Sequence, residues 1–254
     1  MNNKITLCFL FILLSLIFVT IGVSAKESGF SMDAVLEKEA KSVLNRIDLT
    51  FLTEEPPKEA INCFDVNENG LFVVGCETGM KKTVCVYSYE GIFQFGYSFV
   101  DAGSIYVELF DDYLAIYTVR GSLAIVLDFT GNVEKILAII NTPHNNQYWY
   151  YLTKLTSKET KSAIFKIRND MGFLFNLFAS DYSQVVVKEA NGEEKIIYDV
   201  NSGQFAKKLT FLIGLIIFVA IVVFCIVKWF PKTNPGKTGG RQGTARKTGD
   251  GFLS

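Results

Sequence analysis

Histidine is nearly absent from this chain of 254 residues, and His144 is the only one. A single histidine excludes a Ser/His/Asp set and any histidine-based metal cluster, and in the polar loop at 141–146 we expect it to be solvated. Catalysis needs convergent polar groups, so we expect no catalytic residue, no metal and no cofactor. The composition also lacks the bias of a disordered chain, a collagen-like fibre or a nucleic-acid binder.

The formal net charge of −1 conceals a division of charge along the chain. Residues 26–206 carry 16 Lys and Arg against 25 Asp and Glu, whereas residues 228–254 carry six against one. Apolar residues make up 49% of the chain, and the mean hydropathy of +0.26 is high for a soluble domain. An acidic block joined to a basic tail is not the composition of an ordinary cytosolic enzyme.

The first of two long apolar runs covers residues 5–23, which carry no charge and follow Lys4. Small residues Val23 and Ala25 stand at the −3 and −1 positions of a signal-peptidase site. Residues 1–25 are therefore predicted to be a signal peptide. The 19-residue run is also nearly long enough to span a bilayer, so an uncleaved signal anchor is the alternative.

The second run, residues 209–227, is again uncharged and predicts a transmembrane helix over residues 207–229. Trp229 stands where interfacial aromatic residues collect, and Pro231 ends the helix. The run itself would contact membrane lipid.

Basic residues near the second run set the expected orientation. The tail, residues 230–254, is predicted to be flexible, basic and attracted to anionic lipid. The positive-inside rule then places the C-terminus in the cytoplasm and the acidic block outside the cell membrane. The protein would be single-pass, or two-pass if the first run is uncleaved, and the acidic block is outside in both cases.

Residues 26–58 are predicted to form one amphipathic helix and a proline linker. Apolar positions from Met32 to Ile47 follow helical spacing, with Ser31 as a candidate N-cap. We expect this apolar stripe to cover an open end of the following domain, with a partner helix or a membrane surface as the alternative. The segment 54–57, Glu-Glu-Pro-Pro, is expected to be extended.

Residues 59–206 are predicted to be an all-β domain, because short Val-, Ile-, Tyr- and Phe-rich runs alternate with turn signals. The runs align as a repeat whose marker glycines, Gly91, Gly131 and Gly172, fall 40 and 41 residues apart. The three copies, and a shortened fourth copy, cover residues 71–95, 114–136, 148–175 and 185–203.

A period near 40 with four short strands per unit is the spacing of propeller blades. The motif of an apolar strand, a turn such as Asp128-Phe-Thr-Gly131 and another strand resembles blades of bacterial propeller proteins of the NHL type. The resemblance implies propeller-like antiparallel meanders in three to four units. About 145 residues are too few for six or seven blades, so we expect an incomplete or minimal ring, or a curved sheet capped by the N-terminal helix. Exposed sheet edges would favour self-association.

Three of the five cysteines fall in the predicted β domain. Cys76 and Cys85 flank a turn and would form a cross-strand disulfide if pairing is symmetric about it, leaving Cys63 over. Buried free thiols are the alternative, and the spacing is not that of a zinc site.

The leading functional prediction is a membrane-anchored, extracytoplasmic binding or scaffold protein that is not an enzyme. Its partner would be another protein or a second copy, and its binding surface would carry Tyr148, Trp149 and Tyr150, although these side chains could equally be core. A subunit of an envelope or export complex is the third hypothesis.

The competing hypothesis, and the second in order, is an enzyme: a metal-dependent propeller hydrolase. It follows from the resemblance, since some propellers hold a metal in a central channel with carboxylates and asparagine. Asp111, Asp112, Asp128 and Asn132 would be its ligands. Asp111 and Asp112 are also typical turn residues, and we expect them to stabilise the backbone of a turn.

Overall fold

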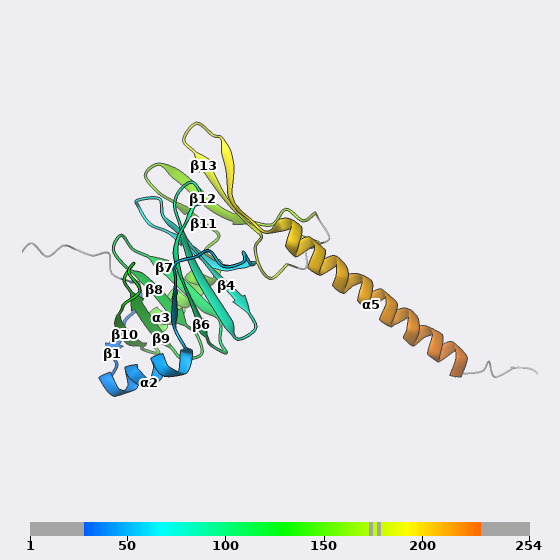
Figure 1. Ribbon diagram of the computed structural model, residues 1–254, viewed down its shortest axis with the longest axis horizontal. Coiled ribbons are helices and arrows are strands. Elements are labelled where there is room, and N and C mark those ends of the chain that lie inside the picture. Colours follow the sequence, from blue (N-terminus) through cyan, green and yellow to red (C-terminus); the bar gives the residue numbers. More distant parts are fainter. Residues whose placement is uncertain (1–27, 173–174, 177–178, 230–254) are drawn as a thin grey trace, which may run out of the picture. The chain divides into compact units, whose positions relative to one another are not determined.

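The computed structural model describes residues 28–172, 175–176 and 179–229 (Figure 1). The chain divides into two compact units, residues 1–208 and 209–254. Within the described residues, the first unit contains three antiparallel sheets, two helices and the first turns of a long third helix, whose apolar part belongs to the second unit. The apolar run at 5–23 and the basic tail at 230–254 lie outside the described residues.

Each sheet is built around a meander of four consecutive strands. The first sheet has the order β2-β6-β5-β4-β3, the second β1-β10-β9-β8-β7 and the third β11-β12-β13-β14. Their strands are β1 (Met32–Ala34), β2 (Thr50–Leu52), β3 (Ile61–Val66), β4 (Phe72–Thr78), β5 (Lys81–Tyr87), β6 (Phe93–Val100), β7 (Ile105–Leu109), β8 (Leu114–Thr118), β9 (Leu123–Leu127), β10 (Val133–Ile139), β11 (Ser157–Glu159), β12 (Ala163–Arg168), β13 (Gln184–Glu189) and β14 (Glu194–Asp199).

One type of hairpin loop recurs in all three sheets. The loops at 67–71, 88–92, 128–132 and 189–193 each have a backbone hydrogen bond from the N–H of the first residue to the C=O of the fifth, and a glycine with positive φ, between 81° and 104°, at the fourth position. A type I turn followed by a left-handed residue matches the twist of the strands, and glycine adopts that conformation without strain. The turn glycines of the sequence pattern therefore have a structural cause.

The predicted third copy is wrong in its alignment. Residues 148–151 lie in helix α3 (Pro143–Lys154), not in a strand. The glycine of the third sheet that corresponds to Gly91 and Gly131 is Gly192, between β13 and β14, whereas Gly172 follows β12. Residues 185–203 thus belong to the third meander and do not start a fourth. Helix α3 is inserted before the third meander and shifts its strands toward the C-terminus.

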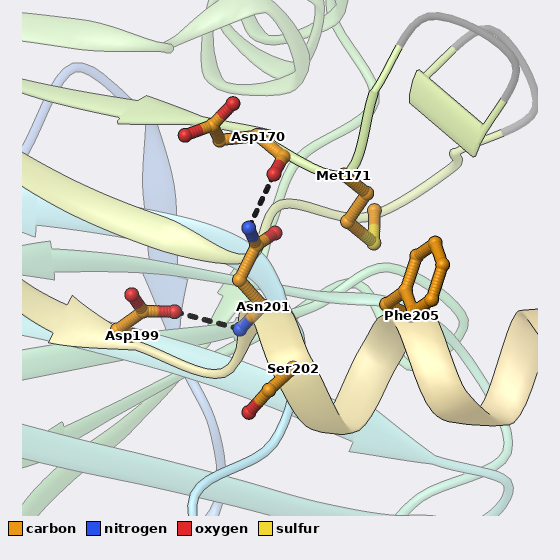
Figure 2. A pocket seen from close by; sticks show the side chains of 6 residues that line it. All are labelled: Asp170, Met171, Asp199, Asn201, Ser202 and Phe205. Atoms are coloured by element: carbon orange, nitrogen blue, oxygen red, sulfur yellow. Dashed lines mark hydrogen bonds between the residues drawn. The ribbon is translucent and has the colours of Figure 1, made fainter.

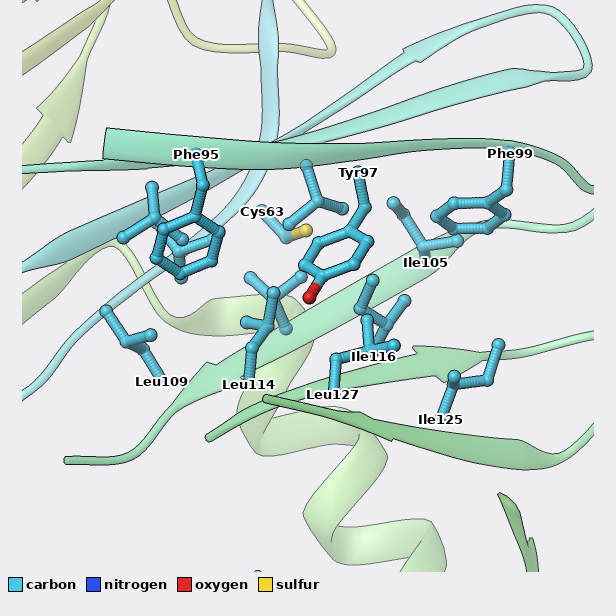
Figure 3. Packing of buried hydrophobic residues seen from close by; sticks show 14 of the residues in the cluster. Cys63, Phe95, Tyr97, Phe99, Ile105, Leu109, Leu114, Ile116, Ile125 and Leu127 are labelled. Carbon is cyan, nitrogen blue, oxygen red and sulfur yellow. The ribbon is translucent and has the colours of Figure 1, made fainter. Parts of the chain in front are cut away.

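The first sheet is the central layer of the first unit. One of its faces packs on the second sheet, where Phe95, Tyr97 and Phe99 of β6 meet apolar side chains of β7, β8 and β9 (Figure 3). On its other face, Phe72 and Val74 pack in an apolar cluster with side chains of the third sheet. Burial on both faces explains the continuous apolar runs of β4 and β5, because neither face of these strands meets water.

The outer face of the second sheet is covered by α3, whose Leu152 is buried there with Tyr117 of β8 and Phe30. The spatial order is therefore second sheet, first sheet, third sheet. In a propeller the second of three successive blades would lie between the other two. Within the described residues no sheet closes on itself, so the structure supports a β-rich fold of three stacked antiparallel sheets and not a ring.

The N-terminal helix is shorter than predicted. Helix α2 covers Glu37–Ile47, and its N-cap is Leu36 without a side-chain hydrogen bond, not Ser31. Met32 lies in β1, which pairs with β10 through Met32 and Ile139. Met32 fits an apolar position of either element, and pairing with β10 determines the outcome. The stripe of α2 does cover the core between the first and second sheets, as expected, through the buried Ile47 and the half-buried Val43 and Leu44.

Helix α5 covers Asn201–Trp229 and so starts several residues before the predicted transmembrane boundary. Its segment Asn201–Ile226 is long and apolar enough to cross a membrane, with a mean hydropathy of 3.2 over its most apolar 18 residues. Most of its large apolar side chains are exposed, Phe211 most of all at 74%. A helix of this length and composition matches the hydrocarbon thickness of a bilayer.

Candidate functional site

The three residues of the predicted aromatic surface all lie on α3, but they differ in how far they are buried. Tyr148 and Trp149 are half-buried against the second sheet, with ring centroids 4.7 and 4.6 Å from that of Phe30. Tyr150 is 67% exposed and its neighbour Tyr151 is 49% exposed. Successive helical residues point in different directions, so two aromatic rings anchor the helix and two face outward.

Local sequence explains why a helix forms here despite its aromatic residues. The Thr142 side chain caps the helix by accepting a hydrogen bond from the Asn145 backbone N–H, at 3.1 Å, and Pro143 occupies the first turn. Proline with a preceding Thr is a helix-start signature, which could have revealed α3 in the sequence. The four aromatic residues favour a strand by propensity alone.

Glu108 of β7 fixes α3 to the second sheet. Its carboxylate accepts hydrogen bonds from the hydroxyls of Tyr117, Ser28 and Tyr148. Burial raises the pKa of both tyrosines, and the Glu108 carboxylate acts in the same direction, so both hydroxyls stay protonated as donors. The network is structural, because every oxygen in it is engaged within the fold.

Asn145 and His144 hold the N-terminal segment on the same helix. The buried Asn145 side chain bonds the Ser31 N–H and C=O and the Ile140 carbonyl, at 2.7 to 2.9 Å. His144 is exposed, but it lies in the first turn of α3 and not in the predicted loop, and its Nε2 lies 2.8 Å from the Gly29 carbonyl oxygen. The outward rings of α3 therefore stand on a well-supported helix.

The residues proposed for a hydrolase are turn residues. Asp111 and Asp112 lie in the β7–β8 turn, where Asp111 accepts a hydrogen bond from Asn69 Nδ2 at 3.1 Å. Asp128 accepts hydrogen bonds from Thr130 and from Asn132, which lower the pKa of its carboxyl. Among the residues that the structure describes, no group of three or more His, Cys, Asp or Glu is placed to hold a metal.

The predicted cysteine pair does not lie directly across the hairpin. Cys76 is paired with Thr83, and Cys85 with Val74, so the two cysteines are diagonal neighbours. Diagonal positions are about 7–8 Å apart, beyond the usual span of a disulfide. Both thiols are free and buried, and burial raises the pKa of each to about 12. Such thiols are inert toward oxidants and metals. Cys63 is likewise buried and free.

A hollow of about 680 Å³ lies beside the first turn of α5 (Figure 2). Its lining includes Met171 and Phe205, together with Asp199, whose carboxylate accepts a hydrogen bond from the Asn201 N–H at 2.7 Å. The Asn201 side chain also donates to the Asp170 carbonyl. These bonds satisfy the end of the helix, and the acidic side chain complements its dipole. The polar groups of this hollow therefore cap α5.

Two ion pairs with a buried member are absent from the sequence-based prediction, one between the first and third sheets and one within the first sheet. Asp65 of β3 is buried, pairs with Lys158 of β11 at 2.5 Å and accepts the Leu109 N–H of β7 at 2.8 Å. One carboxylate thus joins all three sheets. No local sequence pattern predicts this contact, because the partners of Asp65 are 44 and 93 residues away in the chain.

The second ion pair lies at the far end of the β4–β5 hairpin. Glu77 pairs with the buried Lys82 at 2.8 Å and accepts the Ile105 N–H of β7 at 3.0 Å. The free edge of β7 is therefore covered by acidic side chains from the first sheet, and it is not left open for another strand.

Comparisons of the chain with protein-family models, with curated proteins and with solved structures give no match.

Proposed function

We propose that the protein is a membrane-anchored, extracytoplasmic binding or scaffold protein without enzymatic activity. The observation that carries the proposal is α5, whose apolar segment follows directly on the last strand of the β-rich unit. None of its most apolar stretch is buried within the protein. Lipid is the medium that such a surface requires. The basic tail at 230–254 supports a cytoplasmic C-terminus.

The binding surface in this proposal is the outward side of α3. Tyr150 and Tyr151 together offer two large amphipathic rings, and Lys154 Nζ lies 5.7 Å from the Tyr150 ring centroid. Tyrosine gives much contact area for little loss of side-chain entropy and is enriched where proteins bind one another. The rigid support below the helix, from Tyr148 and Asn145, lowers the ordering cost of binding.

Membrane fractionation tests the anchor. We expect the full chain to stay in the membrane after alkaline carbonate washing, and the double variant Ile216→Arg/Val219→Arg to be released. Each arginine at the centre of a span costs about 2.5–3.5 kcal/mol. The matched control, Ile216→Leu/Val219→Leu, keeps an apolar helix and should stay. Retention of the double-arginine variant, where N-terminal sequencing finds Lys26 and so shows that residues 5–23 have been removed, would contradict anchoring by α5.

Site-directed photocrosslinking in cells tests the surface. We expect a photoreactive phenylalanine analogue at Tyr150 to give one discrete crosslinked product, and the same analogue at the exposed Asn191 to give none. A product of twice the chain mass would identify a second copy as the partner. Equal labelling from both positions, or none from Tyr150, would contradict a specific surface on α3.

A further inference from the structure

A second hollow, of about 390 Å³, is formed by segments that lie far apart in the sequence. Its lining comes from the end of α2, the β4–β5 turn, the β6–β7 loop and the β8–β9 turn. The residues are Arg46, Met80, Val100, Asp101, Ala102, Arg120 and Gly121. None of them belongs to α3, so this hollow is separate from the aromatic surface proposed above.

The two guanidinium groups of the hollow are unpaired. Residues 26–206 contain three arginines, and Arg168 pairs with Glu194 at 3.2 Å. The guanidinium groups of Arg46 and Arg120 have neither an ion pair nor a hydrogen bond within the described part of the chain. In a segment with a net charge of −9, acidic partners are abundant elsewhere, and yet these two cations line one hollow.

The carboxylate of Asp101 also lines the hollow, but it stabilises the β6–β7 loop. Asp101 Oδ2 accepts the Gly103 N–H at 3.0 Å, and its backbone N–H donates to the Met80 carbonyl at 2.9 Å. The loop approaches the β8–β9 turn so closely that a Cβ at Gly103 would lie 2.6 Å from Arg120 Cβ. These contacts fix the backbone of Met80 and of Arg120 at the rim of the hollow.

The hollow also offers apolar surface beside the cations. Met80 is 58% exposed and Val100 is 40% exposed. Guanidinium groups bind carboxylate and phosphate through paired hydrogen bonds, and methionine adapts its shape to aliphatic groups. We propose that this hollow binds an oxyanion that carries a short aliphatic group, either a carboxylate or a phosphate ester.

Methionine-methyl NMR of the full chain in lipid nanodiscs tests the proposal directly, because Met80 reports from the hollow. The probes are butyrate and monobutyl phosphate, with butanol and butylammonium as neutral and cationic controls. We expect a saturable shift of the Met80 signal, assigned with Met80→Leu, by at least one anion. The signals of Met32 and Met171, which do not line this hollow, should stay fixed. The more tightly bound anion identifies the chemical group.

Arginine variants provide the decisive comparison. Arg46→Gln and Arg120→Gln should each weaken binding about tenfold or more, as expected for the loss of one charge-assisted contact. Arg168→Gln removes the same charge elsewhere and should leave the affinity unchanged. The proposal is overturned if neither anion shifts Met80 saturably, if butanol or butylammonium acts equally, or if Arg168→Gln weakens binding as much. Membrane fractionation does not depend on this hollow, so either proposal can fail alone.

Discussion

Single side chains join the sheets where backbone pairing ends. The buried Asp65 is the strongest case, because it contacts a cation of the third sheet and a backbone N–H of the second. Burial raises the pKa of its carboxyl, while Lys158 and the Leu109 N–H act in the opposite direction. Its geometry, with both charges engaged, favours the ionised pair.

A double-mutant cycle tests this junction. We expect Asp65→Asn and Lys158→Met each to lower the free energy of unfolding by about 3 kcal/mol, because each leaves a partly buried group without its partner. The double variant should lose less than the two single losses together. Chemical denaturation of the full chain in detergent measures all three. Additive losses would show that the pair is not coupled.

Asp128 makes a prediction about pH. Hydrogen bonds from Thr130 and Asn132 lower the pKa of its carboxyl in the folded protein. A lowered carboxyl pKa stabilises the fold above the unfolded value of about 3.9, and the stabilisation is lost as the pH falls toward the folded pKa. The difference in Tm between wild type and Asp128→Asn should therefore be largest near neutral pH and shrink below about pH 4. A difference that grows in acid would contradict this assignment.

At the scale of elements, the hairpin loops determine how sheets meet. Gly91 and Gly192 occupy equivalent loops with φ of 84° and 87°. A Cβ at Gly91 would lie 2.3 Å from the Ile197 carbonyl oxygen of β14, whereas a Cβ at Gly192 would meet nothing within 4 Å. The β5–β6 loop of the first sheet therefore packs against the edge of the third.

These two glycines form a matched pair for mutation. Both alanine variants incur the left-handed strain of about 1–2 kcal/mol. Gly91→Ala should cost roughly 1–3 kcal/mol more, because the third sheet must shift to admit the methyl group. Thermal unfolding of the full chain in detergent compares them. Equal losses of stability would show that the loop and β14 are not in contact.

The sequence predicted correctly those strands, turns and helices that are determined by residues close together in the chain. Strands such as β4, β5, β8 and β9, the glycine loops and the apolar helix were all visible in the sequence. Helix α3 was missed because Tyr148, Trp149, Tyr150 and Tyr151 have strand propensity, while the cap at Thr142 and packing on the second sheet determined the outcome. The repeat alignment failed for the same reason, since α3 separates the second meander from the third.

The hollow of Arg46 and Arg120 could not be predicted. Four segments between residues 46 and 121 converge there, and none carries a motif. Its position depends on the register of two sheets and on how closely the backbone at Gly103 approaches the β8–β9 turn. Long-range packing of this kind has no periodic signature in a sequence.

At the scale of the whole molecule, the division of charge and the exposed apolar helix point the same way. The β-rich unit carries the acidic residues, α5 carries the uncharged run, and the sequence beyond it is basic. In the proposed topology the acidic sheets lie outside the membrane and the tail inside. The central claim is therefore that the two ends of α5 lie on opposite sides of a bilayer.

Cysteine accessibility in intact cells tests that claim most directly. Met80→Cys places a thiol on the exposed β4–β5 turn, and Thr244→Cys places one in the tail. Wild type, whose β-domain thiols are buried, is the background control. A membrane-impermeant maleimide should label Met80→Cys in intact cells and Thr244→Cys only after the membrane is permeabilised. Labelling of both positions, of neither, or of the tail alone in intact cells would contradict the account.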